Sequence, residues 1–199
     1  MQWDAIGTTF VTLTVIMDPV GAAPIFVACT SRLDAKARQR AALRAVIAAG
    51  ALIIGFALFG GAVLDYLDVS VDSLSIAGGL LLLLVALEML RGMDYPDEGA
   101  AAEDVALVPI ATPLLAGPGA IATVIVLSRR HHELGGRAAV LVGILGALAV
   151  VGVAMLAADR LSRLLPESLV HFLTRVLGLL LSAIAVQLVV NGVRGTIVG

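Results

Sequence analysis

Residues 5–30 read AIGTTFVTLTVIMDPVGAAPIFVACT, an apolar run that Asp18 and Pro19 interrupt near its middle. A helix needs about 20 apolar residues to cross the hydrocarbon core of a bilayer, so this run is long enough to span a membrane. Proline removes a backbone donor and clashes with the preceding helical turn. The stretch therefore predicts a transmembrane helix that is broken near the middle of the bilayer.

The composition of the whole chain is that of an integral membrane protein. Hydrophobic residues make up 60% of its 199 residues and charged residues 14%, whereas soluble domains are about 45–50% apolar and about 25% charged. Five further runs have spanning length, at 43–64, 71–91, 105–128, 137–158 and 169–192. We expect an all-α membrane protein with six transmembrane helices, forming a single integral domain over residues 1–199 in a lipid bilayer. The net charge of −2 argues against a nucleic-acid partner.

The 13 basic residues are divided unevenly between the two sets of polar stretches. Nine lie on the side of the first, third and fifth stretches: Arg32, Lys36, Arg38, Arg40, Arg44, Arg91, Arg160, Arg163 and Arg175. Four lie on the other side: Arg129, Arg130, Arg137 and Arg194. Because cytoplasmic loops carry an excess of Lys and Arg, this distribution predicts that both termini lie outside the cell.

The second half of the chain resembles the first when it is shifted by 99 residues. Matching pairs are Pro19 and Pro118, Ala23 and Ala122, Arg38 and Arg137, Gly79 and Gly178, and Ala86 and Ala185. The constant shift predicts two repeats, at about 1–95 and about 100–199. Each holds three spans, an odd number, so the second repeat must enter the membrane from the opposite side. Inverted repeats are typical of secondary transporters, and coincidence of composition is the alternative.

Both repeats carry helix-breaking residues at the corresponding place. Residues 17–24 read MDPVGAAP and residues 113–119 read PLLAGPG. Breaks leave unpaired backbone groups, which a membrane tolerates only where they are buried in protein or line a cavity. The N-termini of half-helices offer free N–H groups and partial positive charge, which suit a carboxylate. We therefore expect a solute site at the two breaks, with proline kinks that only shape the packing as the alternative. Its candidate residues are Pro19, Gly21, Gly117, Pro118 and Gly119.

Asp18 is an acidic residue deep in the first predicted span. Acidic groups at such a depth are energetically costly and are usually functional. Asp18 is therefore a candidate for binding a coupling proton or sodium ion, or the ammonium group of a solute. The alternative is that Asp18 caps the half-helix that follows it by accepting free N–H groups. The two roles are compatible, and the repeat counterpart of Asp18, Gly117, carries no carboxylate.

Three further polar side chains lie in apolar spans. Glu88 is one turn from Arg91, so snorkelling and an ion pair at the membrane surface account for it. Gln187 and Asn191 lie one turn apart in the last span, where they either hydrogen-bond between helices or line the path of the solute. We retain both as candidate solute-binding residues. Cys29 is the single cysteine, and the histidines lack a metal-ligand spacing. No catalytic motif is present, so we expect neither a metal site nor an enzyme.

Three stretches resemble the MarC family of bacterial and archaeal membrane proteins. They are residues 18–26 (DPVGAAPIF), 109–121 (PIATPLLAGPGAI) and 185–192 (AVQLVVNG), with support from residues 78–90. The resemblance extends over nearly the whole chain. It implies six spans and transport of small neutral amino acids such as alanine and glycine. The family is also similar to the LysE-type amino acid exporters, which implies export.

The chain departs from the family at one position of the first motif. The family commonly has Asn after the glycine of that motif, where this chain has Ala22. If that amide binds solute in the family, the departure implies a different substrate here, or no transport.

Together these features predict a secondary transporter that moves a small neutral amino acid or a similar zwitterion across the cytoplasmic membrane by alternating access. Asp18 would couple transport to a proton or a sodium ion, and no other cofactor is expected. A passive channel with the same broken helices, or a non-transporting membrane assembly or stress protein, are the alternatives. The apolar helix faces also allow for a homo-oligomer.

Overall fold

The computed structural model of the protein describes residues 2–30, 33–91, 116–158, 160 and 166–198. Its helices are α1 (Gln2–Met17), α2 (Pro19–Cys29), α3 (Ala35–Tyr66), α4 (Val71–Arg91), α5 (Pro118–Arg130), α6 (Leu134–Leu156) and α8 (Glu167–Val198). Within the described ranges the chain forms helices and the turns between them, and no strand occurs. The all-α fold expected from the composition is confirmed.

Five helical stretches in the described part of the chain are long and apolar enough to cross a membrane. They cover Trp3–Ala23, Ala35–Tyr66, Val71–Arg91, Leu134–Leu156 and His171–Ile197, and each overlaps a predicted span. The first part of the remaining predicted span, 105–115, lies outside the described residues, and its described part, 116–128, contains most of α5. A helix of 13 residues is only about 20 Å long, so α5 alone does not cross a hydrocarbon core of about 30 Å.

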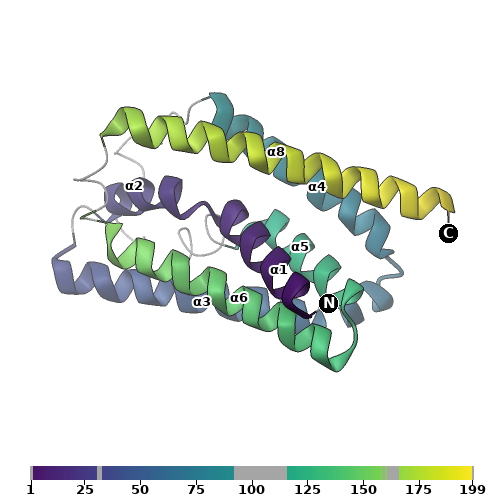
Figure 1. Cartoon of the computed structure of the whole chain (residues 1–199). Coiled ribbons are helices and arrows are strands. Elements are labelled where there is room, and N and C mark those ends of the chain that lie inside the picture. Colours follow the sequence, from purple (N-terminus) through teal and green to yellow (C-terminus); the bar gives the residue numbers. More distant parts are fainter. Residues whose placement is uncertain (1, 31–32, 92–115, 159, 161–165, 199) are drawn as a thin grey trace.

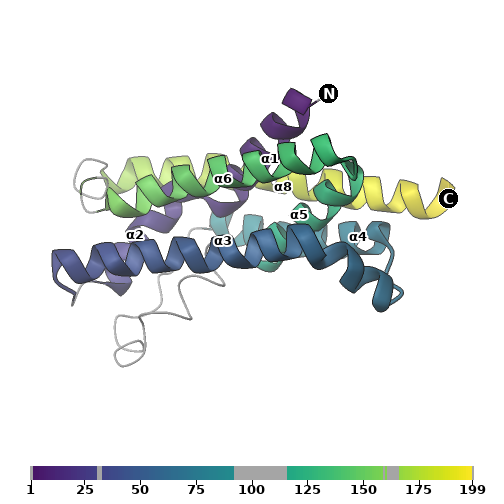
Figure 2. The same ribbon diagram turned by 90° about the horizontal axis from the view of Figure 1, so that it is seen from below.

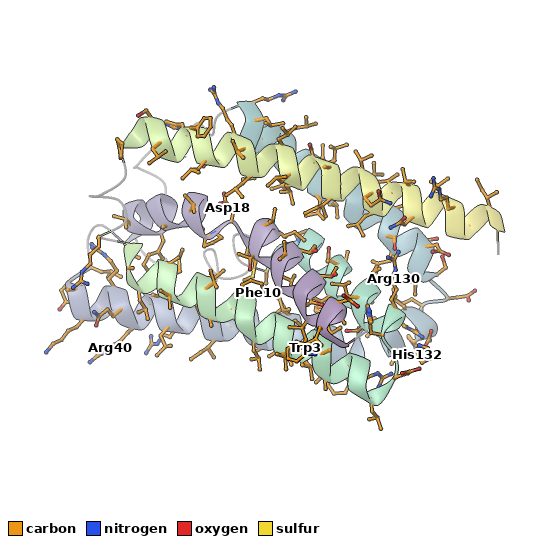
Figure 3. All side chains as sticks on the ribbon, in the orientation of Figure 1. Trp3, Phe10, Asp18, Arg40, Arg130 and His132 are labelled. Carbon is orange, nitrogen blue, oxygen red and sulfur yellow. The ribbon has the colours of Figure 1, made fainter. Side chains whose placement is uncertain are left out.

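The second span begins earlier than its apolar run. α3 starts at Ala35, so Lys36, Arg38 and Arg40 are helical rather than part of a separate polar stretch. The Asp34 carboxylate caps this start by accepting a hydrogen bond from the N–H of Ala37 at 2.7 Å. Alanine, lysine, arginine and glutamine, which fill the first turns, all favour helix. The basic stretch therefore extends the span at one end of the bundle, where Figure 3 places Arg40.

Helix starts recur at the shift of 99 residues that the sequence shows. α2 begins at Pro19 and α5 begins at Pro118. α3 begins after Asp34 and α6 begins after Glu133, both of which are N-cap residues with extended backbone. The 99-residue correspondence is therefore present in the secondary structure as well as in the amino-acid types.

The helices pack in layers that run along the length of the molecule. α4 and α8 form one outer pair and α3 and α6 form the other, and α1, α2 and α5 lie between the two pairs (Figure 1). Figure 2 shows α3 and α6 extending along the bundle, and both termini lie at the same end. The short helices that flank the breaks therefore occupy the centre of the molecule.

The outer pair α4 and α8 packs closely through glycine. A Cβ on Gly79 would lie 2.7 Å from the carbonyl oxygen of Ala185 and 2.7 Å from Cγ2 of Val189. At such distances only a residue without a Cβ fits, so Gly79 lets the two helix backbones approach each other. Small residues have this role at many helix contacts in membranes.

The same contact is repeated with the roles of the two helices exchanged. Gly178, the counterpart of Gly79 in the second half, approaches the carbonyl oxygen of Ala86 and the side chain of Leu90. Ala86 and Leu90 lie 99 residues before Ala185 and Val189, the residues that Gly79 approaches. Leu82 and Leu181, which are also counterparts, are both buried in this interface. The two antiparallel helices therefore meet through equivalent residues.

Candidate functional site

The first break separates α1 from α2 at Asp18, near the middle of the bundle (Figure 3). Asp18 has a φ of 38°, in the left-handed region that Asp tolerates better than most residues. Pro19 opens α2 at its first position, where the missing N–H removes no helical hydrogen bond. The predicted interruption of the first span is confirmed.

The Asp18 side chain caps α2. Its Oδ1 accepts a hydrogen bond from the N–H of Gly21 at 3.0 Å. Its backbone carbonyl accepts one from the N–H of Ala22 at 2.9 Å. Asp18 is only 8% exposed, so the carboxylate is held inside the protein. The capping role that the sequence left open is therefore present, and it uses one of the free N–H groups at the start of α2.

Gly21 is required by the close approach of this carboxylate. A Cβ on Gly21 would overlap Oδ2 of Asp18 and would lie 3.0 Å from its Cγ. Any larger residue at this position must therefore displace the Asp18 side chain. The close approach of Asp18 therefore explains why position 21 is glycine, without any contact between Gly21 and a solute.

The end of α1 supplies acceptors at the same point. Pro19 has no N–H, so the carbonyl of Val15 cannot form its usual helical hydrogen bond. The last carbonyls of a helix carry partial negative charge. The hydroxyl of Thr14, one turn before Asp18, is buried and has no hydrogen-bond partner within the described residues. The first break therefore gathers oxygen atoms as well as N–H groups.

The second break, as far as the structure describes it, is the start of α5. Gly117 is the N-cap, with an extended backbone at φ −61° and ψ 164°, and Pro118 follows at the first helical position. The carbonyl of Gly117 accepts a hydrogen bond from the N–H of Ile121 at 3.1 Å. Gly117 has no side chain to cap the N–H groups of the first turn. This helix start lacks the internal carboxylate that Asp18 provides at the first break.

A cavity of about 190 Å³ lies at the start of α5. Its walls come from the second break, from one face of α4 and from α1. The residues are Ile16, Leu81, Leu82, Leu84, Val85, Glu88, Gly117, Pro118, Gly119 and Ala120. Three of the predicted solute-binding residues, Gly117, Pro118 and Gly119, are therefore brought together at one cavity.

The two breaks are neighbours through the residues that flank them. Ile16, two residues before Asp18, lines the cavity of the second break. Met17 and Ala22, on either side of Asp18 in the chain, belong to the same buried cluster as Ala116 and Ala120. Asp18 itself, with Pro19 and Gly21, is not among the lining residues of the cavity.

Gln187 and Asn191 lie apart from the cavity, on α8. The Nε2 of Gln187 donates a hydrogen bond to Oδ1 of Asn191 at 2.8 Å, one turn along the same helix. Gln187 is exposed and Asn191 is half-buried, and neither lines the cavity. Within the described residues the two amides bind each other rather than a neighbouring helix.

Glu88 lies at the cavity, where the sequence analysis did not place it. An ion pair with Arg91 is the sequence-based expectation, and the described part of the chain shows no such pair. Glu88 instead lines the cavity, together with residues one and two turns before it on α4. One feature of the sequence pointed to this position. Glu88 is the repeat counterpart of Gln187, which is a candidate solute-binding residue.

Comparison with known proteins finds relatives over nearly the whole chain. Residues 3–197 match a family described as MarC family integral membrane protein. The chain is 39% identical over 189 residues to UPF0056 membrane protein MJ1677 of Methanocaldococcus jannaschii, covering 92% of each protein.

Two bacterial relatives extend the same match. The chain is 36% identical over 203 residues to UPF0056 membrane protein YhcE of Escherichia coli, covering 96% of this chain and 92% of the relative. It is 29% identical over 204 residues to UPF0056 membrane protein YvbG of Bacillus subtilis, covering 98% and 97%. No solved structure matches significantly. The resemblance that the motifs indicated is confirmed.

Proposed function

Because the chain belongs to the MarC family of integral membrane proteins, we propose that it is a secondary transporter of a small neutral amino acid or a similar zwitterion. One observation carries the proposal. Two helices start at prolines 99 residues apart, inside the bundle and between the long outer helices. Paired interruptions at corresponding positions of two halves are the best pointer to the solute site of a transporter.

The solute carboxylate binds at the start of α5 in this proposal. Gly117 leaves the N–H groups of the first turn without a side-chain cap. Helix N-termini bind anions through such N–H groups and through the positive end of the helix dipole. The start of α2, at Pro19 and Gly21, offers a second N-terminus, and Asp18 occupies one of its N–H groups in the described conformation.

Asp18 binds the coupling cation, a proton or a sodium ion. Its carboxylate lies where α1 ends, so the free carbonyls of α1 add negative potential around it. The buried Thr14 hydroxyl one turn away supports a cation at this place, because it has no partner within the described residues. The left-handed backbone of Asp18 is a strained conformation of the kind that gathers at functional sites.

Alternating access arises from movement of two inverted repeats around this central site. The exchanged contacts of Gly79 and Gly178 support this arrangement, because antiparallel helices that meet through equivalent residues fit a two-fold axis in the membrane plane. The position of the breaks between the outer pairs supports a site that either side can reach in turn.

We place the Arg40 end of the bundle in the cytoplasm and both termini outside, in the cytoplasmic membrane. Arg40 and Arg130 lie at opposite ends of the bundle (Figure 3). The basic start of α3 gives the Arg40 end the larger share of positive charge, and cytoplasmic ends of membrane helices carry such an excess. The bilayer and a small solute are the partners in this proposal, and a homo-oligomer is compatible with it.

The test is solute flux in proteoliposomes that contain the purified protein. Labelled alanine and glycine are followed with and without an imposed proton or sodium gradient, and empty liposomes give the background. A coupled transporter accumulates the solute above its external concentration when the gradient is present. Strictly downhill flux would instead make the protein a channel, and no flux of either solute would contradict the proposal for small neutral amino acids.

A further inference from the structure

The cavity beside α5 is lined by a charged residue that the proposed function leaves without a role. Glu88 lines this cavity, and its carboxylate has no ion-pair partner within the described residues. The other lining positions in the described chain are glycine, alanine, proline or branched apolar residues. Glu88 is exposed, so its carboxylate is accessible to a cation that binds in the cavity.

The spacing on α4 makes Glu88 part of one continuous wall. Leu81, Val85 and Glu88 follow each other at four and three residues, so they lie on one face of the helix. Leu82 joins this wall to the second break, because a Cβ on Gly119 would lie 2.5 Å from the Cγ of Leu82. The Glu88 wall and the start of α5 therefore face the same small space.

The size of this space suits a small molecule. Pockets for drug-sized ligands have volumes of about 300–1,000 Å³, and this cavity has about 190 Å³. Its apolar walls suit a short aliphatic side chain, such as the methyl group of alanine. A solute placed here would lie near both the start of α5 and Glu88, because both line the cavity.

We propose that Glu88 binds the ammonium group of the transported amino acid in this cavity. The inference rests on the proposed function, and it assigns the two acidic residues different roles. Glu88 holds the solute ammonium, the start of α5 holds the solute carboxylate, and Asp18 holds the coupling cation. The other described lining residues are uncharged, so Glu88 is the one side chain among them whose charge attracts an ammonium group.

Asp18 is less suited to the ammonium group in the described conformation. One of its carboxylate oxygens already accepts the N–H of Gly21, and Asp18 does not line the cavity. Glu88 satisfies both conditions that Asp18 lacks. This division also explains why the site can select a zwitterion, because a site that holds a polar group rejects analogues that lack that group.

The experiment compares alanine with lactate, which has the same size and carboxylate but a hydroxyl in place of the ammonium group. Uptake of labelled alanine is measured in proteoliposomes with the full-length protein, and unlabelled lactate is added as a competitor. Glu88→Gln keeps the size of the side chain and removes its charge. We expect its KM for alanine to rise at least tenfold with a much smaller change in maximal rate. We also expect lactate to compete nearly as well as alanine in this variant.

Two further variants separate charge from folding. Glu88→Asp retains the charge and should transport alanine with a KM between those of the wild type and Glu88→Gln. Glu133→Gln is the matched control, because Glu133 is an exposed glutamate at the start of α6 and makes no side-chain cap hydrogen bond. Its KM should equal that of the wild type.

The cavity itself is tested by filling it. Val85 lines the cavity and is 44% exposed, and Val186 on α8 is 49% exposed outside it. Val85→Trp should abolish alanine uptake, and Val186→Trp should leave it unchanged.

The outcomes distinguish this inference from the proposed function. Wild-type uptake together with a normal KM and unchanged lactate rejection in Glu88→Gln would overturn the role of Glu88 and leave the transporter proposal intact. Absence of alanine uptake by the wild-type protein would overturn both. Equal loss of uptake in Glu88→Gln and Glu88→Asp, with an unchanged KM for residual activity, would show that the charge of residue 88 is not what the solute recognises.

Discussion

The two breaks start their helices in the same way, but they differ in whether a side chain caps the free N–H groups of the helix. Each has a proline at the first helical position, and the two prolines are 99 residues apart. At the first break the N-cap is Asp18, whose carboxylate is buried and accepts the N–H of Gly21. At the second break the N-cap is Gly117, which has no side chain, and a cavity lies beside it.

This difference distinguishes the residues that the fold needs from the residues that determine what each break binds. Proline and glycine interrupt the helix at both places, so the fold needs those residues whatever the protein binds. A capping carboxylate is present at the start of α2 and absent at the start of α5, so the two helix starts cannot bind the same ligand equally well. A helix start that is capped from within suits a cation near its carboxylate. A helix start without a cap leaves its N–H groups to an external anion.

The largest effect is expected from removing the charge of Asp18. Asp18→Asn retains an oxygen that can accept the N–H of Gly21, and Asn tolerates a positive φ. We therefore expect gradient-driven alanine uptake to fall to background while membrane insertion and the thermal midpoint stay nearly unchanged. Asp18→Ala removes the cap as well, and it should lower the free energy of unfolding by about 0.5–2 kcal/mol.

Uptake and thermal denaturation of these two variants measure charge and cap separately. Undiminished gradient-driven uptake by Asp18→Asn would mean that the first break needs the cap and not the charge. The first break would then differ from the second in its capping side chain and not in the function of a charge.

The second effect comes from making the second break resemble the first. Gly117→Asp places a carboxylate at the start of α5, where the φ of −61° accommodates Asp without strain. The new carboxylate would accept the free N–H groups, with a stability gain of a few tenths of a kcal/mol. It would also repel the solute carboxylate, so we expect at least a tenfold loss of alanine uptake.

Gly117→Ser is the control for this change, because serine caps without a negative charge. It should lose less uptake than Gly117→Asp. If both variants transport alanine normally, the start of α5 does not bind the solute carboxylate.

The third effect concerns the glycine that touches Asp18. Gly21→Ala forces the Asp18 carboxylate to move, because a Cβ at that position overlaps Oδ2. We expect a loss of about 1 kcal/mol in stability, from a lost cap that the better helix propensity of alanine only partly offsets. Gly7→Ala is the matched control on α1, since its Cβ would meet nothing within 4 Å.

Thermal denaturation of the two variants is the measurement. Gly7→Ala should be neutral or stabilising by up to about 1 kcal/mol. A Gly21→Ala protein as stable as Gly7→Ala would show that the contact between Gly21 and Asp18 does not contribute to stability.

Much of this comparison could be predicted from the sequence, because it depends on local chemistry. The break at Pro19, the start of α5 at Pro118 and the capping option for Asp18 all follow from residue types and their order. The shift of 99 residues was visible for the same reason, and the helix starts repeat it.

The partners of side chains across helices could not be predicted in this way. Glu88 was expected to pair with Arg91, but it lines the cavity of the second break. Gln187 and Asn191 were expected to bond between helices or to line the solute path, but they bond to each other on α8. An apolar helix carries no periodic signal that tells which face meets lipid and which meets a neighbour, so these contacts depend on tertiary packing.

The smallest effect is expected from the glycine of the second break. A Cβ on Gly119 would overlap the side chain of Leu82, which lines the cavity and can shift into it, whereas Gly21 faces a carboxylate that its own helix holds in place. Gly119→Ala should therefore change stability by less than about 1 kcal/mol, because the gain in helix propensity offsets the displacement of Leu82. The displaced Leu82 narrows the cavity, so the KM for alanine should rise a few-fold while glycine, which lacks the methyl group, is affected less. Equal KM changes for alanine and glycine would mean that the cavity does not hold the side chain of the solute. The difference between the two helix starts would then be the capping carboxylate, which α2 has and α5 lacks.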